Sequence, residues 1–187
     1  MSGSWRVVAR EAPLFGRPWL VLRGERAKGL LFGGRVLELN ARAARRVGPD
    51  VLAEQPDYDR MVANLRAEDQ RRTVGDALID QRLVAGIGTV WRAEALWTVA
   101  VSPWRALADV SDPELREILA AATRLMRRSV AAEWEERKIY GRAGRPCPRC
   151  GAPIRRRGHG DDNRPSFWCP GCQTGPLDQR SGALRAP

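Results

Sequence analysis

The chain has 187 residues and a formal net charge of +10, from 32 Lys and Arg against 22 Asp and Glu. It contains no apolar run near the ~18 residues of a membrane helix and no basic-then-apolar leader, so we expect a soluble, intracellular protein. Lys28 and Lys138 are the only lysines, and this arginine bias favours nucleic acid as a partner, because the guanidinium group suits phosphate. A GC-rich gene, which encodes arginine by default, is the alternative explanation.

Residues 5–39 contain four short runs of β-forming residues, WRVVAR, WLVLRG, GLLFGG and RVLEL, separated by Gly, Pro and charged residues. Runs of this kind predict four short strands. They hold large apolar side chains, each worth roughly 1.5–3 kcal/mol when buried. Their faces and edges therefore need partner strands, and without partners we expect a loss of stability.

From about residue 57 the apolar spacing becomes helical. Asp57 is a suitable N-cap for the segment YDRMVANLRAE that follows it. Thr73 and Asp76 form a Thr-x-x-Asp start, which predicts a helix over VGDALIDQRLV, residues 74–84. These two segments open the helical part of the chain.

The segment LVAGIGTVWRAEALW, residues 83–97, interrupts a helical pattern with two glycines, Gly86 and Gly88. Each glycine costs roughly 1 kcal/mol relative to alanine inside a helix, so we expect a short turn, then a helix over VWRAEALWTVA that Pro103 stops. The turn would leave the backbone N–H groups of Gly88 and the two residues after it at a helix N-terminus, where they can bind an anion. Tight packing of two helices explains the glycines equally well.

A capping box precedes the last helix. Ser111 and Glu114 stand three residues apart, with Pro113 in the first turn. Apolar residues then recur at helical spacing, which predicts a long amphipathic helix up to about Val130. These apolar positions are Leu115, Ile118, Leu119, Ala122, Leu125, Met126 and Val130.

The four cysteines form two Cys-x-x-Cys pairs, Cys147 with Cys150 and Cys169 with Cys172. In a chain without an export signal, such pairs indicate a metal site rather than disulfides. Their spacing is typical of a tetrahedral four-thiolate zinc site in which the residues between the pairs fold back as a hairpin. Because four thiolates leave no open coordination position, we expect Zn²⁺ with a structural role. Four unrelated buried cysteines are the alternative.

The expected hairpin carries several basic residues. The arginines at 155–157 are expected to form a solvated run. Arg164 lies at the expected turn, just before Phe167 and Trp168, whose packing would fix its direction toward a phosphate or a base edge. His159, the only histidine, is not needed as a metal ligand and is expected in a solvent-exposed loop.

Two segments resemble the formamidopyrimidine-DNA glycosylase and endonuclease VIII family. ALIDQRLVAGIGTVWRAEALW resembles the family's helix-two-turn-helix, and YGRAGRPCPRCG with NRPSFWCPGCQ resembles its C-terminal zinc finger. IYGRAGRPC and VGPDVLAEQPDYD are most similar to the actinobacterial endonuclease VIII branch, and the resemblance covers nearly the whole chain. It implies a base-excision repair enzyme that flips an oxidised base out of duplex DNA, cuts its glycosidic bond and cleaves the backbone as a lyase.

The resemblance also implies the DNA-binding residues. Gly86 and Gly88 would let the backbone approach the DNA, Thr89 stands at the phosphate-contacting turn position, and Arg164 would hold the phosphate beside the lesion. The family usually has asparagine where this chain has Thr89. Threonine has a shorter reach and one donor instead of two, so we expect a phosphate contact weaker by about 1 kcal/mol.

Family members begin with a Pro-Glu pair, whose proline amine attacks the sugar C1′ and whose glutamate transfers protons. This chain starts MSGSWRV, which resembles an interior strand of the family's N-terminal β-domain. Met1 would then match the methionine that fills the space left by the flipped base. By this resemblance the nucleophile, its glutamate and a β-hairpin lysine would lie upstream of Met1, and we expect no catalytic residue in this chain. An incorrectly assigned start codon, a truncated gene and a non-catalytic paralogue are the alternatives.

Together these features predict an α+β multidomain chain. Its parts would be a remnant of an N-terminal β-sandwich (1–50), a helix-two-turn-helix DNA-binding domain (51–138), a zinc-finger β-hairpin (139–175) and a flexible tail (176–187). We expect a cytoplasmic, nucleoid-associated monomer that binds double-stranded DNA containing a damaged base, with a pyrimidine preference implied by the endonuclease VIII branch, or an abasic site. A non-catalytic, zinc-dependent damaged-DNA-binding protein and a zinc-ribbon protein on RNA remain open.

Overall fold

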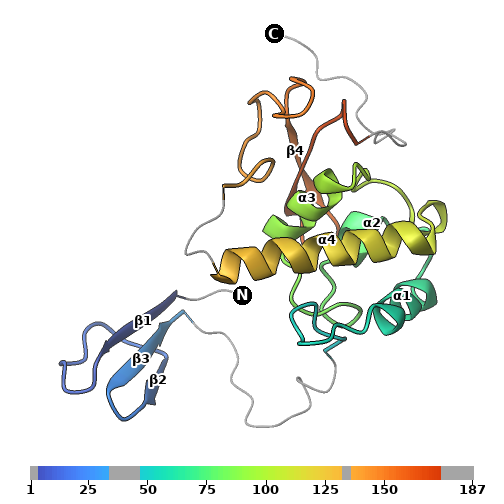
Figure 1. Cartoon of the computed structure of the whole chain (residues 1–187). Helices are drawn as coiled ribbons and strands as arrows, with labels where there is room; N and C mark the ends of the chain where they lie inside the picture. Colours follow the sequence, from blue (N-terminus) through green and yellow to red (C-terminus); the bar gives the residue numbers. More distant parts are fainter. Residues whose placement is uncertain (1–3, 34–46, 132–135, 174–187) are drawn as a thin grey trace. The chain divides into compact units, whose positions relative to one another are not determined.

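The structure is a computed structural model that describes residues 4–33, 47–131 and 136–173. The chain divides into two compact units, Met1–Arg45 and Arg46–Pro187. In Figure 1 the described strands of the first unit are blue, and the second unit runs from cyan to red. Within the described ranges no helix has both the length and the apolar character needed to cross a membrane.

The N-terminal unit is a three-stranded antiparallel sheet in the order β1-β3-β2. Trp5 and Leu20 both lie opposite Leu31, so these three residues share one face of the sheet. Three of the four expected strands are thereby confirmed, and the run RVLEL at 35–39 lies outside the described residues. The strands are β1 (Ser4–Ala9), β2 (Leu20–Arg23) and β3 (Ala27–Phe32).

One face of this sheet is apolar and largely exposed. Trp5 is 52% exposed, Val7 77% and Leu22 55%, whereas Leu30 on the opposite face is fully buried. The strand pattern therefore leaves an apolar face uncovered in the described part of the unit, as the sequence predicted.

The C-terminal unit is built on helices with well-defined starts. The Asp57 carboxylate accepts a hydrogen bond from the Arg60 backbone N at 2.9 Å. The Ser111 backbone N and hydroxyl each lie 2.8 Å from Glu114 Oε2, which confirms the expected capping box. The helices are α1 (Tyr58–Ala67), α2 (Val74–Ala77), α3 (Thr89–Thr98) and α4 (Asp112–Ala131), with a 3-10 turn η2 (Leu107–Asp109).

The predicted helix over 74–84 is wrong in its length, because α2 ends at Ala77. The Asp80 carboxylate accepts a hydrogen bond from the Arg82 backbone N at 3.1 Å, and the Asp80 N donates to Ala77 O at 3.1 Å. These local bonds replace the helical ladder with turns. Thr73 is the N-cap of α2, so the helix starts where the Thr-x-x-Asp pattern predicted, although Thr73 makes no side-chain capping bond.

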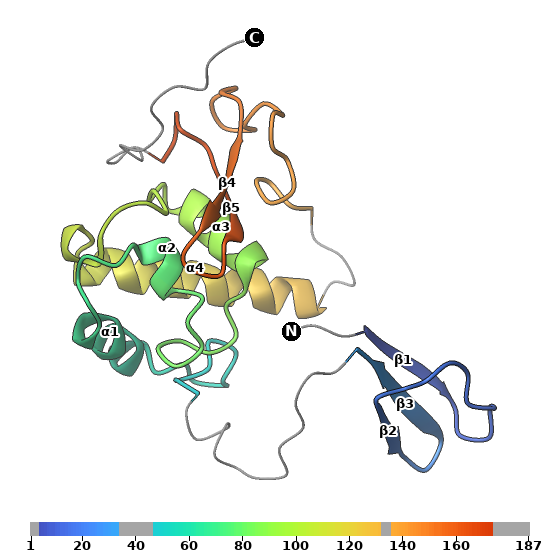
Figure 2. The same cartoon turned by 180° about the vertical axis from the view of Figure 1, so that it is seen from behind.

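α3 ends before the proline that was expected to stop it. Ala100 adopts a left-handed φ of 59°, and the Val101 N donates to Leu96 O at 2.9 Å, so the helix ends at Thr98, ahead of Pro103. α3 lies beside α4 in both views (Figures 1 and 2). The large, fully buried side chains of the helical core are Met61, Leu65, Leu78, Ile87, Leu96, Leu107, Leu115, Ile118 and Leu119.

The cysteine-containing segment forms the expected antiparallel hairpin of β4 (Arg155–His159) and β5 (Arg164–Trp168). A second apolar core joins it to the helices, because Ala93 of α3 packs with Ile139 and Phe167. Figure 2 shows β5 directly against α3. The boundary expected at 138/139 remains a prediction.

Candidate nucleic-acid interface and metal centre

The four cysteine thiols converge on one point, as the spacing predicted. The four Sγ atoms all lie within 4.8 Å of one another. The Cys147 and Cys172 sulfurs are 3.8 Å apart, and those of Cys150 and Cys169 are 3.4 Å apart. Tetrahedral thiolates at ~2.3 Å from a zinc ion would be separated by roughly 3.8 Å, so the donor set fits a four-thiolate metal ion.

The cysteine cluster contacts α3 through Trp97. The Trp97 indole N–H donates to Cys147 Sγ at 3.4 Å, and the Arg149 guanidinium lies over the Trp97 ring at 4.4 Å. Burial raises the pKa of the Cys147 thiol, but the Arg149 and Cys150 amides and the Trp97 indole outweigh it and lower that pKa to about 6. These contacts favour the thiolate, which is the metal-binding form.

The glycine turn before α3 is held by one side chain. Gly86 has a φ of +93°, a backbone conformation that favours glycine, and a Cβ there would be in tight contact with Asp50 Oδ1, at 3.0 Å. Gln81 accepts a hydrogen bond from the Gly86 N at 2.9 Å and donates to Ile87 O at 2.8 Å. Gln81 therefore fixes the turn, a role that nothing in its sequence spacing indicates.

Gly88 lies in open space at the start of α3. A Cβ at Gly88 would meet nothing within 4 Å, so helix packing does not require glycine here. Gly88 is the N-cap of α3, makes no side-chain capping bond, and is followed by Thr89 as the first helical residue. The first N–H groups of α3 thus have no side-chain cap, which is the arrangement that an anion-binding helix N-terminus needs.

Arg164 is the first residue of β5 and lies opposite His159. Its side chain is 47% exposed and forms an ion pair with Asp162, with 2.9 Å between Nη2 and Oδ2. The strand is anchored by Phe167 and Trp168, which are both buried, as expected. The arginines at 155–157 are exposed on β4, also as expected.

A polar crevice of about 330 Å³ separates the residues after α1 from the tip of the hairpin. Arginine and aspartate side chains from residues 72–82 and from the hairpin line it, so positively and negatively charged groups face the same crevice. The charged residues are Arg72, Arg82 and Arg164, with Asp76, Asp80, Asp161 and Asp162.

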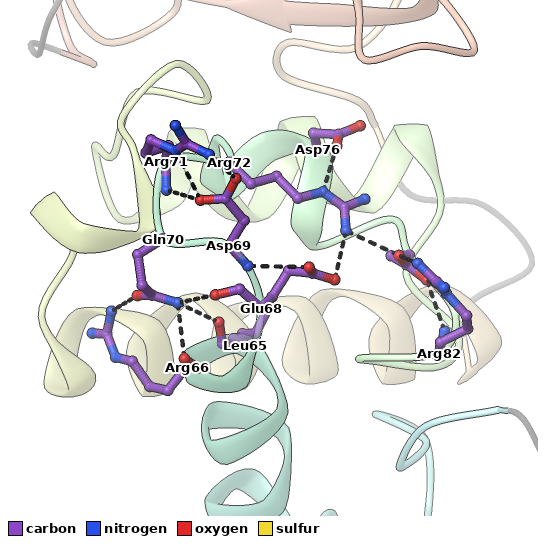
Figure 3. Close-up of polar contacts among 10 residues, drawn as sticks. Leu65, Arg66, Glu68, Asp69, Gln70, Arg71, Arg72, Asp76 and Arg82 are labelled. Atoms are coloured by element: carbon purple, nitrogen blue, oxygen red, sulfur yellow. Dashed lines mark hydrogen bonds and ion pairs between the residues drawn. The ribbon is translucent and has the colours of Figure 1, made fainter.

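Arg72 is the centre of the ion-pair network on the helical side of this crevice (Figure 3). Its guanidinium contacts Glu68 at 3.1 Å, Asp76 at 2.6 Å and Asp80 at 3.0 Å. Asp80 is also 2.6 Å from Arg82, and hydrogen bonding to Arg82 holds the pKa of Asp80 far below its usual range. The network ties the end of α1 to α2 and to the turn that follows α2 at Asp80.

His159 corrects one expectation, because it is only 5% exposed and does not lie in a solvent-exposed loop. Its Nε2 lies 2.6 Å from Thr73 Oγ1, and its ring stacks on Trp104 with 4.1 Å between centroids. Burial, and then the positive charge of Arg92, lower the pKa of His159 to about 4. The histidine is therefore neutral at pH 7 and docks the hairpin on the helices.

A two-turn connection between helices, with a four-cysteine hairpin docked on it, defines the helix-two-turn-helix class of protein. The family model described as the formamidopyrimidine-DNA glycosylase H2TH domain matches residues 47–139. The probable endonuclease 8 2 of Streptomyces coelicolor is 34% identical, over 97% of this chain and 72% of its own length. The DNA-(apurinic or apyrimidinic site) lyase Nei2 of Mycolicibacterium smegmatis is 33% identical, over 93% of this chain and 73% of its own. The chain belongs to the formamidopyrimidine-DNA glycosylase and endonuclease VIII family, which confirms the sequence resemblance.

Solved structures share the fold. The complex of the Lactococcus lactis formamidopyrimidine-DNA glycosylase with abasic-site DNA matches with a TM-score of 0.74 and 19% identity, over 94% of this chain and 73% of that chain. MutM in complex with DNA containing carbocyclic 8-oxo-G matches with a TM-score of 0.74 and 20% identity, over 94% and 72%. The strands and helices described above are therefore those of this fold.

Proposed function

We propose that this chain binds DNA as part of a base-excision repair enzyme of the endonuclease VIII type, a glycosylase with lyase activity. Its partner would be double-stranded DNA containing a damaged base or an abasic site. The observation that carries the proposal is the docking of the hairpin. His159, which lies opposite Arg164 in the hairpin, contacts Thr73, and Pro165, which follows Arg164, contacts Arg92 of α3. Arg164 and the start of α3 therefore belong to one packed unit.

Two groups would bind DNA phosphates. The first is the N-terminus of α3, where the amides near Gly88 and Thr89 combine with the helix dipole. The second is the Arg164 guanidinium, which can form charge-assisted hydrogen bonds with a phosphate. Contacts of this kind position a duplex without reading its sequence, which suits an enzyme that must act at a lesion in any sequence context.

We assign DNA binding, and no catalytic step, to the described residues. By the resemblance, the family's nucleophile is the amine of an N-terminal proline that is followed by glutamate. Among the described residues the Pro-Glu dipeptide is Pro113-Glu114, in the first turn of α4, where the proline nitrogen is part of a peptide bond and has no free amine. Met1, expected to fill the space of a flipped base, lies outside the described residues, and its role stays a prediction. Oxidised pyrimidines are the proposed lesions, because the chain matches endonuclease 8 proteins over most of its length.

We infer that Cys147, Cys150, Cys169 and Cys172 hold Zn²⁺. Support comes from the four convergent sulfurs, which are the whole of this cluster among the residues that the structure describes. A zinc ion with four thiolates has no open position for substrate, so its role would be to order the hairpin that carries Arg164.

The proposal is tested by fluorescence anisotropy with zinc-loaded protein. The probes are a duplex with an abasic-site analogue, the intact duplex and a single-stranded RNA, each titrated with salt. We expect binding to the abasic-site duplex that weakens as salt rises. A preference for the RNA would contradict the proposal and favour a zinc ribbon on RNA.

Borohydride trapping on abasic-site DNA tests our assignment of no catalytic step to the described residues. Retained duplex binding without a covalent product supports DNA binding as the role of these residues. A covalent product would show that an amine of this chain attacks the sugar, and would contradict our assignment of no catalytic step.

A further inference from the structure

Arg92 is a fully buried arginine in the first turn of α3. Its Nη1 donates to Gly75 O at 3.2 Å, and its Nη2 donates to Pro165 O at 2.7 Å. Among the described residues, no carboxylate lies within ion-pair distance of its guanidinium. One side chain thus joins α3, α2 and β5 through backbone carbonyl groups alone.

The burial of Arg92 destabilises the folded state in two ways. A buried guanidinium without an ion-pair partner loses its hydration, and burial lowers the pKa of Arg92 to about 10. Its Nε has no hydrogen-bond partner among the described residues. An apolar side chain of similar length would avoid both penalties, so stability alone does not explain an arginine here.

We propose that Arg92 is a positioning residue for DNA binding, which sets the position of Arg164 relative to the N-terminus of α3. Arg92 lies three residues after Thr89 on the same helix, and its acceptor Pro165 directly follows Arg164 on β5. A bond between them therefore links the two proposed phosphate contacts. The inference rests on the proposed function.

The strength of a bond between Arg164 and a phosphate depends on the position of β5. A guanidinium-to-phosphate bond is strong only near 2.7–2.9 Å, so a displacement of β5 by about an ångström would weaken it. Arg92 cannot touch DNA itself, because none of its surface is exposed. Its influence on DNA must pass through the groups that it holds, and its bond to Pro165, next to Arg164, predicts coupling between Arg92 and Arg164.

A double-mutant cycle tests this coupling, with anisotropy on the abasic-site duplex. Arg92→Met and Arg164→Ala should each weaken binding about tenfold and lower the salt dependence by about one unit of slope, and the double variant should lose little more. The control is Arg66→Met. Arg66 also donates to a backbone carbonyl, Leu107 O at 2.7 Å, but it lies away from the hairpin. Additive losses for Arg92 and Arg164, or an equal loss for Arg66→Met, would overturn the proposal.

The remaining outcomes are also decisive. If Arg92→Met loses its helical circular dichroism or its zinc, Arg92→Lys replaces it in the cycle, because the ammonium can keep one carbonyl contact and the charge. Because Arg92→Lys keeps only one of the two carbonyl contacts, it should weaken binding by less than Arg164→Ala does, and this loss should be absent in the Arg164→Ala background. No loss in the single variant, or a loss that persists in the Arg164→Ala background, would overturn the inference. An unsubstituted chain that binds no DNA refutes the proposed function itself, whereas a binding chain without coupling refutes only the role of Arg92.

Discussion

His159 and Thr73 are 86 residues apart in the sequence, and yet the imidazole Nε2 lies 2.6 Å from the threonine hydroxyl. This contact joins the tip of the hairpin to the residue before α2. Gly160, the next residue, also packs closely on the helices, because a Cβ there would clash with the Asp76 carboxylate. The hairpin is therefore seated on the helices by close polar and backbone contacts, and changes at these contacts should alter both stability and DNA binding.

Acid should weaken the contact between the hairpin and the helices, because it favours protonation of His159. Its pKa is about 4 in the folded chain and near 6.5 when unfolded, so the unfolded state binds the proton first as pH falls. The contribution of neutral His159 to the free energy of unfolding is thus fully present above pH 6.5. As pH falls from 6.5 to 4, up to about 3 kcal/mol of this contribution is lost. Urea unfolding at several pH values measures this loss. His159→Phe, which keeps the stacking surface, should remove that part of the pH dependence; an unchanged slope would contradict the assignment to His159.

Asp162→Asn should tighten DNA binding. The carboxylate of Asp162 now pairs with the Arg164 guanidinium at 2.9 Å, and a DNA phosphate would compete for the same donors. Because both groups are substantially exposed, the gain is modest, about two- to fivefold in Kd. Asp161→Asn is the matched control, since it removes the same charge from the same crevice. Equal gains for both variants would indicate a general charge effect instead of competition.

Arg164→Ala should weaken binding to the abasic-site duplex about tenfold and reduce the salt dependence by about one unit of slope. The comparison is Arg156→Ala. Arg156 is exposed on β4 opposite Phe167, so its side chain lies on the other face of the hairpin from Arg164. Salt titrations of the two variants separate a phosphate contact from loss of net charge. The same slope in Arg164→Ala and the parent chain would refute a phosphate contact at this position.

Thr89→Asn should strengthen DNA binding, because asparagine brings a longer reach and two donors to the N-terminus of α3. The expected gain is about 1 kcal/mol, or roughly fivefold in Kd. Thr89→Ala should weaken binding, which gives a series of three side chains at one site. Isothermal titration with the abasic-site duplex measures the series. A series in which alanine binds as tightly as asparagine would exclude the side chain from the contact.

Removal of zinc with a chelator should unfold the hairpin and leave most of the helical signal. The helices have their own core, which includes Leu65, Leu96 and Leu119, whereas the hairpin core depends on the cysteine cluster. Hydrogen exchange should show lost protection in residues 139–173 and retained protection in α4. Collapse of the far-ultraviolet helical signal on chelation would mean that the two cores cannot exist separately.

Local patterns predicted the elements that local chemistry determines. The capping box at Ser111 and Glu114, the N-cap at Asp57 and the convergence of the cysteine pairs could all be read from short spacings, because each depends on neighbours a few residues away. The turn at Gly86 belongs to the same group, since its left-handed φ excludes most other residues.

Tertiary contacts explain the errors and omissions. The helix predicted over 74–84 had the right periodicity, but the Asp80 carboxylate stabilises turns and is held by Arg72 from outside the segment. The burial of His159 requires Thr73 and Trp104, which are distant in sequence. Nothing in the spacing of Arg92 relates it to Pro165. Only the folded chain brings these groups together.

The packing of Ala93 and Trp97 against the hairpin side has a practical consequence for dissecting the protein. A cut after residue 138 would leave the Trp97 indole and the surface around Ala93 facing water, and it would remove the Ile139 and Tyr140 amides that hydrogen-bond to Glu94 at 3.0 and 2.8 Å. The helical portion expressed alone would then be prone to aggregate. A transfer of the hairpin to another scaffold would likewise have to include α3. The smallest transferable fragment is therefore α3 together with the cysteine hairpin.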